Sequence, residues 1–359
     1  MFRTIKLKLE YDEVLKNTAV LYTKACQTVL DYGFKNKTYH SNRLNEATYN
    51  QVRQEMPQLP SGLVQTARDQ ASDMLRREKC KKLPIKKSLQ IRYDKRTFKL
   101  FPDNEYISLS TIKGRLNFRV KIYEYCKQYL HGQFTNAQLI IRRSKIFINI
   151  QVKLPDIKQN IGNRILGIDR GIMNIITCSD NTFVNSKHLR KIKGNYQYLR
   201  SKLQSVGTRS AKRKLRKVSG RERRFTLDLN HRLAKEVASK PYDVFVVEKL
   251  TNIRKSRKGR IFNKKLGNWS FGQFLIFLKY KTENIGNIII EIDPNYTSQK
   301  CSKCGFIDKN NRYKSKFKCL QCGFELNADL NAARNIGEIG KSELVRLSST
   351  NLSSQRFNS

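Results

Sequence analysis

The spacing of the apolar residues changes along the chain and predicts where strands give way to helices. At residues 5–9, isoleucine or leucine alternates with lysine, which is the two-residue period of a half-buried strand. Residues 12–82 follow a helical period, and short alternating runs separated by polar turns return over residues 83–160. We therefore expect a small β domain, formed by residues 1–11 and 83–160, that a helical insertion interrupts.

The second half of the chain alternates strongly apolar runs with helical stretches. The runs ILGID, DVFVVE and NIIIEID are long enough for buried strands, and helical patterns lie between them. Such alternation predicts an α/β domain with a mixed sheet over residues 161–296 and 326–340. Residues 341–359 are rich in serine and asparagine, and we expect this tail to be disordered.

Three acidic residues occupy positions where a carboxylate is costly unless it serves a purpose. Asp169 and Glu248 each end an apolar strand run, and Asp329 lies near the start of a helix whose Ala332 and Ala333 permit close packing on a sheet. Three converging carboxylates repel one another unless divalent cations bind between them. Two such cations, about 4 Å apart, can activate a water and stabilise the leaving oxygen of a phosphodiester. The alternative is that each acid is a helix cap or an ion-pair partner.

Four cysteines between the second and third acids have the spacing of a zinc site. The motifs CSKCG and CLQCG each place two cysteines on a tight turn that a glycine completes. Four thiolates close a tetrahedron and leave no open coordination position, so this zinc would be structural and would not be the hydrolytic metal. The predicted zinc ligands are Cys301, Cys304, Cys319 and Cys322.

The charge of the chain points to a polyanionic partner. Its 72 Lys and Arg residues face only 29 Asp and Glu residues, giving a formal net charge of +43. Solubility or affinity for anionic membranes are the alternatives, but no apolar span, amphipathic anchor or secretory leader is visible, so we expect no membrane partner. Candidate nucleic-acid contacts, each of which could equally be a solvated surface residue, are Lys212, Arg213, Arg223, Arg224, Arg254 and Arg257.

The order of the acids and the place of the cysteines carry a family resemblance. A glutamate in second position on a strand resembles RuvC-like nucleases, whereas DDE-type transposases place it last on a helix. The cysteine motifs within DPNYTSQKCSKCG…NADLNAARNI, together with GIDRGIMNIIT, VVEKL and LPSGLVQTARDQ, resemble the TnpB family of transposon-encoded RNA-guided endonucleases, relatives of type V CRISPR effectors. The resemblance covers nearly the whole chain. Arg170, after the first acid, departs from the pattern of many members without removing a ligand.

The resemblance implies a multidomain α+β architecture. A ribonuclease H-like (RuvC) domain with an inserted zinc ribbon at residues 297–325 would follow a β-barrel-like wedge domain, which a helical recognition domain interrupts. The protein would bind a guide RNA from the transposon end and double-stranded DNA beside a short target-adjacent motif. It would cut both strands at one site with two Mg²⁺ ions, while base pairing reads the sequence. Arg312, within the ribbon, would hold the scissile strand near the acids.

Two other functions fit the same motifs. One is an RNA-guided transcriptional repressor that keeps the acids but does not cut, and the other is a structure-specific RuvC-like nuclease that needs no guide. Under any of these hypotheses we expect the protein in the cytoplasm of a prokaryote beside the nucleoid, or in the nucleus of a eukaryotic host. The oligomeric state is left open, with a monomer favoured.

Overall fold

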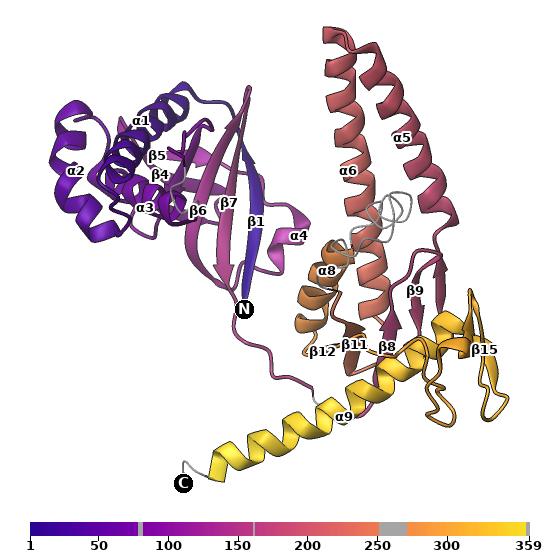
Figure 1. Cartoon of the computed structure of the whole chain (residues 1–359). Helices are drawn as coiled ribbons and strands as arrows, with labels where there is room; N and C mark the ends of the chain where they lie inside the picture. The colour runs from indigo at the N-terminus through magenta and orange to yellow at the C-terminus, as the bar shows by residue number, and fades with distance from the viewer. Residues whose placement is uncertain (78–81, 161, 251–270, 357–359) are drawn as a thin grey trace. The chain divides into compact units, whose positions relative to one another are not determined.

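The computed structural model divides the chain into two compact units (Figure 1). Unit 1 is Met1–Asp156 and unit 2 is Ile157–Ser359. The structure describes residues 1–77, 82–160, 162–250 and 271–356, with side chains up to residue 346. None of the helices in these ranges combines the length and the apolar character needed to cross a membrane.

Unit 1 contains two antiparallel sheets. In the larger sheet Ile5 pairs with Ile150 and Leu7 with Ile148, so the alternating apolar residues face one core. Its strand order is β1 (Phe2–Leu9), β7 (Lys145–Lys153), β6 (Gln133–Arg142) and β2 (Gln90–Tyr93). The smaller sheet consists of β3 (Phe98–Phe101), β4 (Tyr106–Thr111) and β5 (Gly114–Arg119). These seven described strands form no closed barrel, so the barrel-like prediction is wrong: alternation predicts strands but not how their edges pair.

Three helices form the predicted insertion. They are α1 (Glu13–Lys35), α2 (Ser41–Glu55) and α3 (Ser61–Arg77), and a short helix, α4 (Glu124–Lys127), follows β5. Asp12 caps α1 by accepting a hydrogen bond from the Leu15 amide at 2.9 Å. Tyr22 of α1 and Leu63 of α3 are fully buried in the same apolar core as Ile5 of the sheet. The helices therefore share the core of the β strands within one compact unit.

A mixed five-stranded sheet, as the sequence predicts, forms the centre of unit 2. Its strand order is β10 (Phe183–Asn185), β9 (Asn174–Cys178), β8 (Ile165–Asp169), β11 (Val244–Glu248) and β12 (Ile288–Ile292). Strands β8, β9 and β10 are antiparallel, whereas β11 runs parallel to both β8 and β12. Alternate residues of β11 enter different cores: Phe245 contributes to one face and Val246 to the other. Burial on both faces explains the continuous apolar runs.

Helices cover both faces of this sheet. On one face lie α6 (Arg209–Ala238) and α8 (Phe271–Glu283), and on the other lies α9 (Ala328–Arg356). Helix α5 (Lys187–Val206) runs beside α6 (Figure 1). Glu222 of α6 joins the two through ion pairs with Lys193 at 3.1 Å and Arg200 at 3.0 Å. Three short strands next to α9 complete the unit: β13 (Arg312–Tyr313), β14 (Lys316–Lys318) and β15 (Glu325–Asn327).

Helix α9 extends further than the sequence predicts. Its residues Ile336, Ile339 and Leu344 pack against the β11 and β12 face of the sheet. Their spacing keeps the apolar side chains on one side of a helix through residue 344. Where the sequence predicts a disordered tail from residue 341, the structure continues α9 to Arg356. The Ser- and Asn-rich composition obscured this pattern.

The backbone of α9 lies almost directly on β8, and a glycine permits this approach. A β-carbon at Gly167 would collide with the carbonyl oxygen of Ala333 and would lie 2.5 Å from the amide nitrogen of Gly337. We predict that Gly167→Val lowers the free energy of unfolding by at least about 1–3 kcal/mol, because the helix must move away from the sheet. Chemical denaturation measures this change. Gly194→Ala, in open space on α5, is the control and should not destabilise. Equal stability of the two variants would contradict the close packing.

Candidate active site and cysteine cluster

Two of the predicted acids end adjacent parallel strands. The pairing of β8 with β11 runs as far as Ile168 and Val247, so Asp169 and Glu248 are the next residues on neighbouring strands. Asp169 also pairs with Thr177 of β9. The sheet alone therefore brings two carboxylates to one edge.

The third acid approaches from α9. Asp329 lies in the first turn of this helix and is 9% exposed. One of its carboxylate oxygens accepts a hydrogen bond from Asn174 Nδ2 at 2.9 Å, and the other forms an ion pair with Arg312 Nη2 at 3.0 Å. Asn174 begins β9, so the contact ties the helix to the strand that pairs with Asp169. The structure thus brings the three acids into one electrostatic group.

Burial and mutual repulsion shape the charge of this group. Burial, followed by the charges of Glu248 and Asp329, raises the pKa of Asp169 to about 7, while Arg312 opposes the rise. Burial also raises the pKa of Glu248, against a hydrogen bond from Thr297 and the charges of Arg170 and Arg312. Such a group has more negative charge than its protein neighbours compensate, which is the condition that favours a bound cation.

The three carboxylates are not drawn into a single tight ligand cluster. Across the described ranges, the four cysteines are the one group of three or more metal-binding side chains whose donor atoms all lie within 4.8 Å of one another. The oxygens of Asp329 are held instead by Asn174 and Arg312, and Glu248 is held by Thr297. A pair of cations about 4 Å apart can bridge such a wider arrangement of oxygens.

Three further residues support the acids, and the sequence predicts a role for none of them. Asn174 binds Asp329, and the hydroxyl of Thr297 donates to Glu248 Oε1 at 2.6 Å. Arg170 is buried and donates to the backbone carbonyls of Glu248 and, at 3.4 Å, Phe271. All three lie inside the motifs that carry the family resemblance, GIDRGIMNIIT and DPNYTSQKCSKCG. Their polar side chains within these motifs were the signal in the sequence that could have identified them as partners of the acids.

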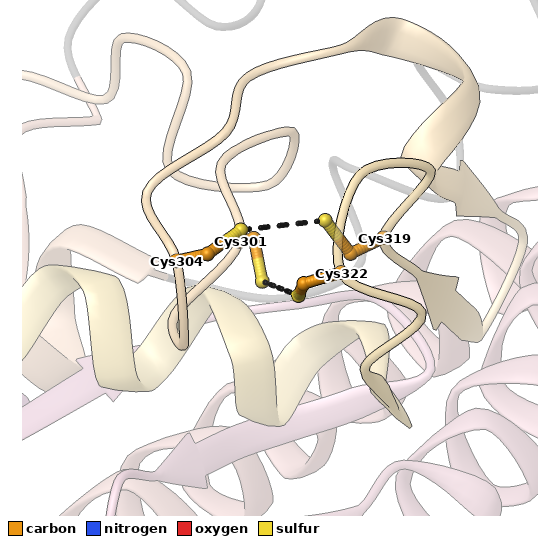
Figure 2. A group of neighbouring side chains, drawn as sticks. All are labelled: Cys301, Cys304, Cys319 and Cys322. Carbon is orange, nitrogen blue, oxygen red and sulfur yellow. Dashed lines mark hydrogen bonds between the residues drawn. The ribbon is translucent and has the colours of Figure 1, made fainter.

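The four cysteines form two matching turns that face each other (Figure 2). Gly305 and Gly323 have φ of 82° and 66°, and their amides donate to the carbonyls of Cys301 and Cys319 at 2.9 Å and 3.0 Å. The sulfur atoms of Cys301 and Cys322 are 3.8 Å apart, and those of Cys304 and Cys319 are 3.6 Å apart. This geometry could hold one metal ion among four sulfur atoms.

The predicted basic contacts are distributed over several elements. Arg312 lies beside Asp329, as described above. Exposed positions on α6 are occupied by Lys212, Arg213, Arg223 and Arg224. Arg254 and Arg257 lie outside the described residues. Contact with nucleic acid remains a prediction for all of them.

Comparison with known families places the acids and cysteines in two recognised segments. A family described as "Probable transposase" matches residues 149–256, and one described as "Cas12f1-like, TNB domain" matches residues 271–336. The TnpB-like protein MJ0751 of Methanocaldococcus jannaschii is 28% identical over 240 residues, covering 62% of this chain and 84% of that protein. The resemblance to the TnpB family is confirmed.

TnpB-like sequence is shared with longer proteins as well. The CRISPR-associated endodeoxyribonuclease Cas12f1 of Sulfoacidibacillus thermotolerans is 50% identical over 91 residues, or 25% of this chain and 20% of that protein. A Cas12f1 from an uncultured archaeon is 27% identical over 246 residues, covering 58% of this chain and 46% of its own length. The chain thus spans less than half of these two curated relatives.

Solved structures show the shared fold. A Cas12f1 chain, in a complex with sgRNA and target DNA, superimposes with a TM-score of 0.65 at 16% identity, covering 90% of this chain and 81% of that one. The mini-RNA-guided endonuclease CRISPR-Cas_phi3 gives a TM-score of 0.53 at 12% identity, with 95% and 92% coverage. The chain therefore has the multidomain α/β fold of these proteins.

Proposed function

We propose that this chain is an RNA-guided DNA endonuclease that hydrolyses phosphodiesters at a RuvC-like site formed by Asp169, Glu248 and Asp329. The observation that carries the proposal is the convergence of these acids from the ends of β8 and β11 and from the first turn of α9. The mixed sheet, with α9 on the face that α6 and α8 leave free, agrees with the ribonuclease H-like domain that the sequence predicts. Relatives named as endodeoxyribonucleases support the same activity.

The acids suit magnesium. Mg²⁺ prefers oxygen ligands, and the half-buried Asp169 and Glu248 offer carboxylates at one edge of the sheet. The charge of Asp329 acts on Asp169 and helps to raise its pKa. Two Mg²⁺ ions, when bound, would activate the attacking water and stabilise the leaving oxygen. Arg170 fixes the end of β11 through the Glu248 carbonyl, and Arg312 provides a partly exposed cation beside Asp329 that can meet a phosphate.

The cysteine cluster suits a structural zinc. Tetrahedral zinc with Zn–S bonds of about 2.3 Å places its sulfurs roughly 3.8 Å apart. The observed separations of 3.6 Å and 3.8 Å fit this arrangement without rearrangement of the turns. The predicted ligands are all four cysteines, so no position is open for a substrate water. We therefore assign this cluster to holding residues 297–325 in place.

Guide RNA and double-stranded DNA are the proposed partners. The net charge of +43 and the exposed arginines and lysines of α6 support the proposal of a polyanion-binding surface. In such systems base pairing reads the target, while the protein reads backbone shape and a short target-adjacent motif. The non-cutting repressor would keep the same three acids, so what favours cutting over it is that the relatives are named as endodeoxyribonucleases.

Reconstituted cleavage tests the proposal. The purified chain with RNA from the transposon end should convert a matched plasmid to the linear form in Mg²⁺, and EDTA should stop the reaction. A plasmid without the complementary segment is the control and should stay intact. An uncut matched plasmid at full occupancy would favour the repressor, and cutting without RNA would favour the guide-free nuclease.

A further inference from the structure

The carboxylate of Glu248 is held by a residue that lies outside the sheet. The Thr297 hydroxyl donates to Glu248 Oε1 at 2.6 Å, and Thr297 is 4% exposed. Thr297 belongs to the segment that leads from β12 into the cysteine cluster. A hydrogen bond of this kind restricts the rotation of the carboxylate and fixes where its oxygens point.

Two asparagines of α9 hold the segment that carries Thr297. Asn335 Nδ2 donates to the carbonyl oxygen of Thr297 at 2.8 Å and to that of Lys300 at 2.7 Å. Asn331 Nδ2 also donates to the Lys300 carbonyl, at 2.8 Å, and its Oδ1 accepts from the Ser302 amide at 3.0 Å. Both side chains are almost fully buried, and four-residue spacing places them on one face of the helix.

The same helix therefore reaches two of the acids by different routes. It carries Asp329 in its own first turn, and it reaches Glu248 through Asn335 and Thr297. Buried asparagines need hydrogen-bond partners in any protein, so their bonds alone are explained by packing. The Thr297 hydroxyl is different, because it donates a hydrogen bond to the Glu248 carboxylate, which the proposed function assigns to metal binding.

We propose that Thr297 is a positioning residue that orients the Glu248 carboxylate for metal binding, and that Asn335 acts through Thr297. The inference rests on the proposed function, since it takes Glu248 as a metal ligand. Groups that hydrogen-bond to metal ligands commonly alter metal affinity or activity by about 10–100-fold when they are removed. Helix α9 would in this way fix the position of the Asp329 carboxylate relative to that of Glu248.

The decisive variant is Thr297→Val, which removes the hydroxyl and keeps nearly the same volume. Free Mn²⁺ is followed by electron paramagnetic resonance as the full chain is added without nucleic acid. Thr297→Val should bind Mn²⁺ about 10–100-fold more weakly than the wild-type chain. Cleavage at low Mg²⁺ should fall in parallel and recover at high Mg²⁺. Thr297→Ser should retain both properties. Thr282→Val is the matched control, because the buried Thr282 hydroxyl donates to carbonyls of its own helix.

The role of Asn335 is tested by a double-variant cycle. If Asn335 acts through Thr297, Asn335→Ala should weaken Mn²⁺ binding in the wild-type chain but have little further effect in Thr297→Val. Additive effects would overturn this part of the proposal. Zinc content and the unfolding midpoint of each variant separate loss of positioning from loss of structure.

The outcomes distinguish this inference from the proposed function. If the wild-type chain binds Mn²⁺ but does not cut, the proposed endonuclease activity is contradicted. The change in Mn²⁺ affinity in Thr297→Val then still tests the positioning role. A wild-type chain that cuts, with Thr297→Val binding Mn²⁺ and cutting equally well at every metal concentration, overturns the positioning alone. A wild-type chain that neither binds Mn²⁺ nor cuts overturns both, and one that cuts without binding Mn²⁺ overturns the positioning alone.

Discussion

Asp169→Asn should make the fold more stable at pH 8 in EDTA, although it should also abolish cleavage. Burial and the charges of Glu248 and Asp329 raise the pKa of Asp169 to about 7, from an ordinary value of 3.8. Because the folded-state pKa is the higher one, the wild-type fold is most stable with respect to this group below pH 3.8, where Asp169 is protonated in both states. That stability is lost as the pH rises through about 7 and the buried carboxyl must ionise. Asparagine carries no such charge, so the gain at pH 8 should reach up to about 4 kcal/mol.

Chemical denaturation at several pH values measures this effect. The stabilisation by Asp169→Asn should shrink as the pH falls below 7, because the wild-type carboxyl then becomes protonated in the folded chain. Asp228→Asn is the control, since Asp228 is exposed and pairs with Arg232 of its own helix. An Asp169→Asn chain that is less stable than wild type at pH 8 would show that Asp169 supports the fold.

The same variant should lose cleavage while it keeps RNA and DNA binding. The substitution removes a charged metal ligand and leaves every basic residue in place. Plasmid cleavage and nucleic-acid binding, measured on one preparation, separate the two effects. Cutting at the wild-type rate would remove Asp169 from the metal site.

Cys319→Ser should release zinc and reduce cleavage together. Structural zinc stabilises isolated zinc-finger peptides by about 10–16 kcal/mol, so losing a ligand should unfold the segment that the cluster holds. That segment includes Thr297 and Arg312, which contact Glu248 and Asp329 respectively. The metal site should therefore lose two of its supports, although neither residue binds zinc.

Zinc content by atomic absorption, protease sensitivity and plasmid cleavage check this result. Gln321→Ala is the matched control, because Gln321 is an exposed residue between Cys319 and Cys322. It should keep zinc, protease resistance and cleavage. Unchanged zinc content and cleavage in Cys319→Ser would show that the four cysteines do not form a required zinc site.

Local patterns were sufficient to predict much of the fold and the identity of the candidate site. Apolar runs and alternation depend on neighbours in the chain, so they predicted the mixed sheet and placed Asp169 and Glu248 at its strand ends. Cysteine pairs with their glycines are equally local, and the predicted turns at Gly305 and Gly323 are confirmed. The order of the acids around these cysteines also carried the family resemblance.

Only the tertiary structure decided how distant segments meet. The bond from Asn174 to Asp329 joins residues 155 apart in sequence, and the bond from Thr297 to Glu248 joins residues 49 apart. No short-range period encodes such pairs, because their contact depends on strand order and on the path of α9 across the sheet. For the same reason the sequence did not reveal that unit 1 forms two sheets instead of a closed barrel. What the sequence determined was which residues are chemically suited to the site; the folded sheet and α9 decided which side chains hold them in place.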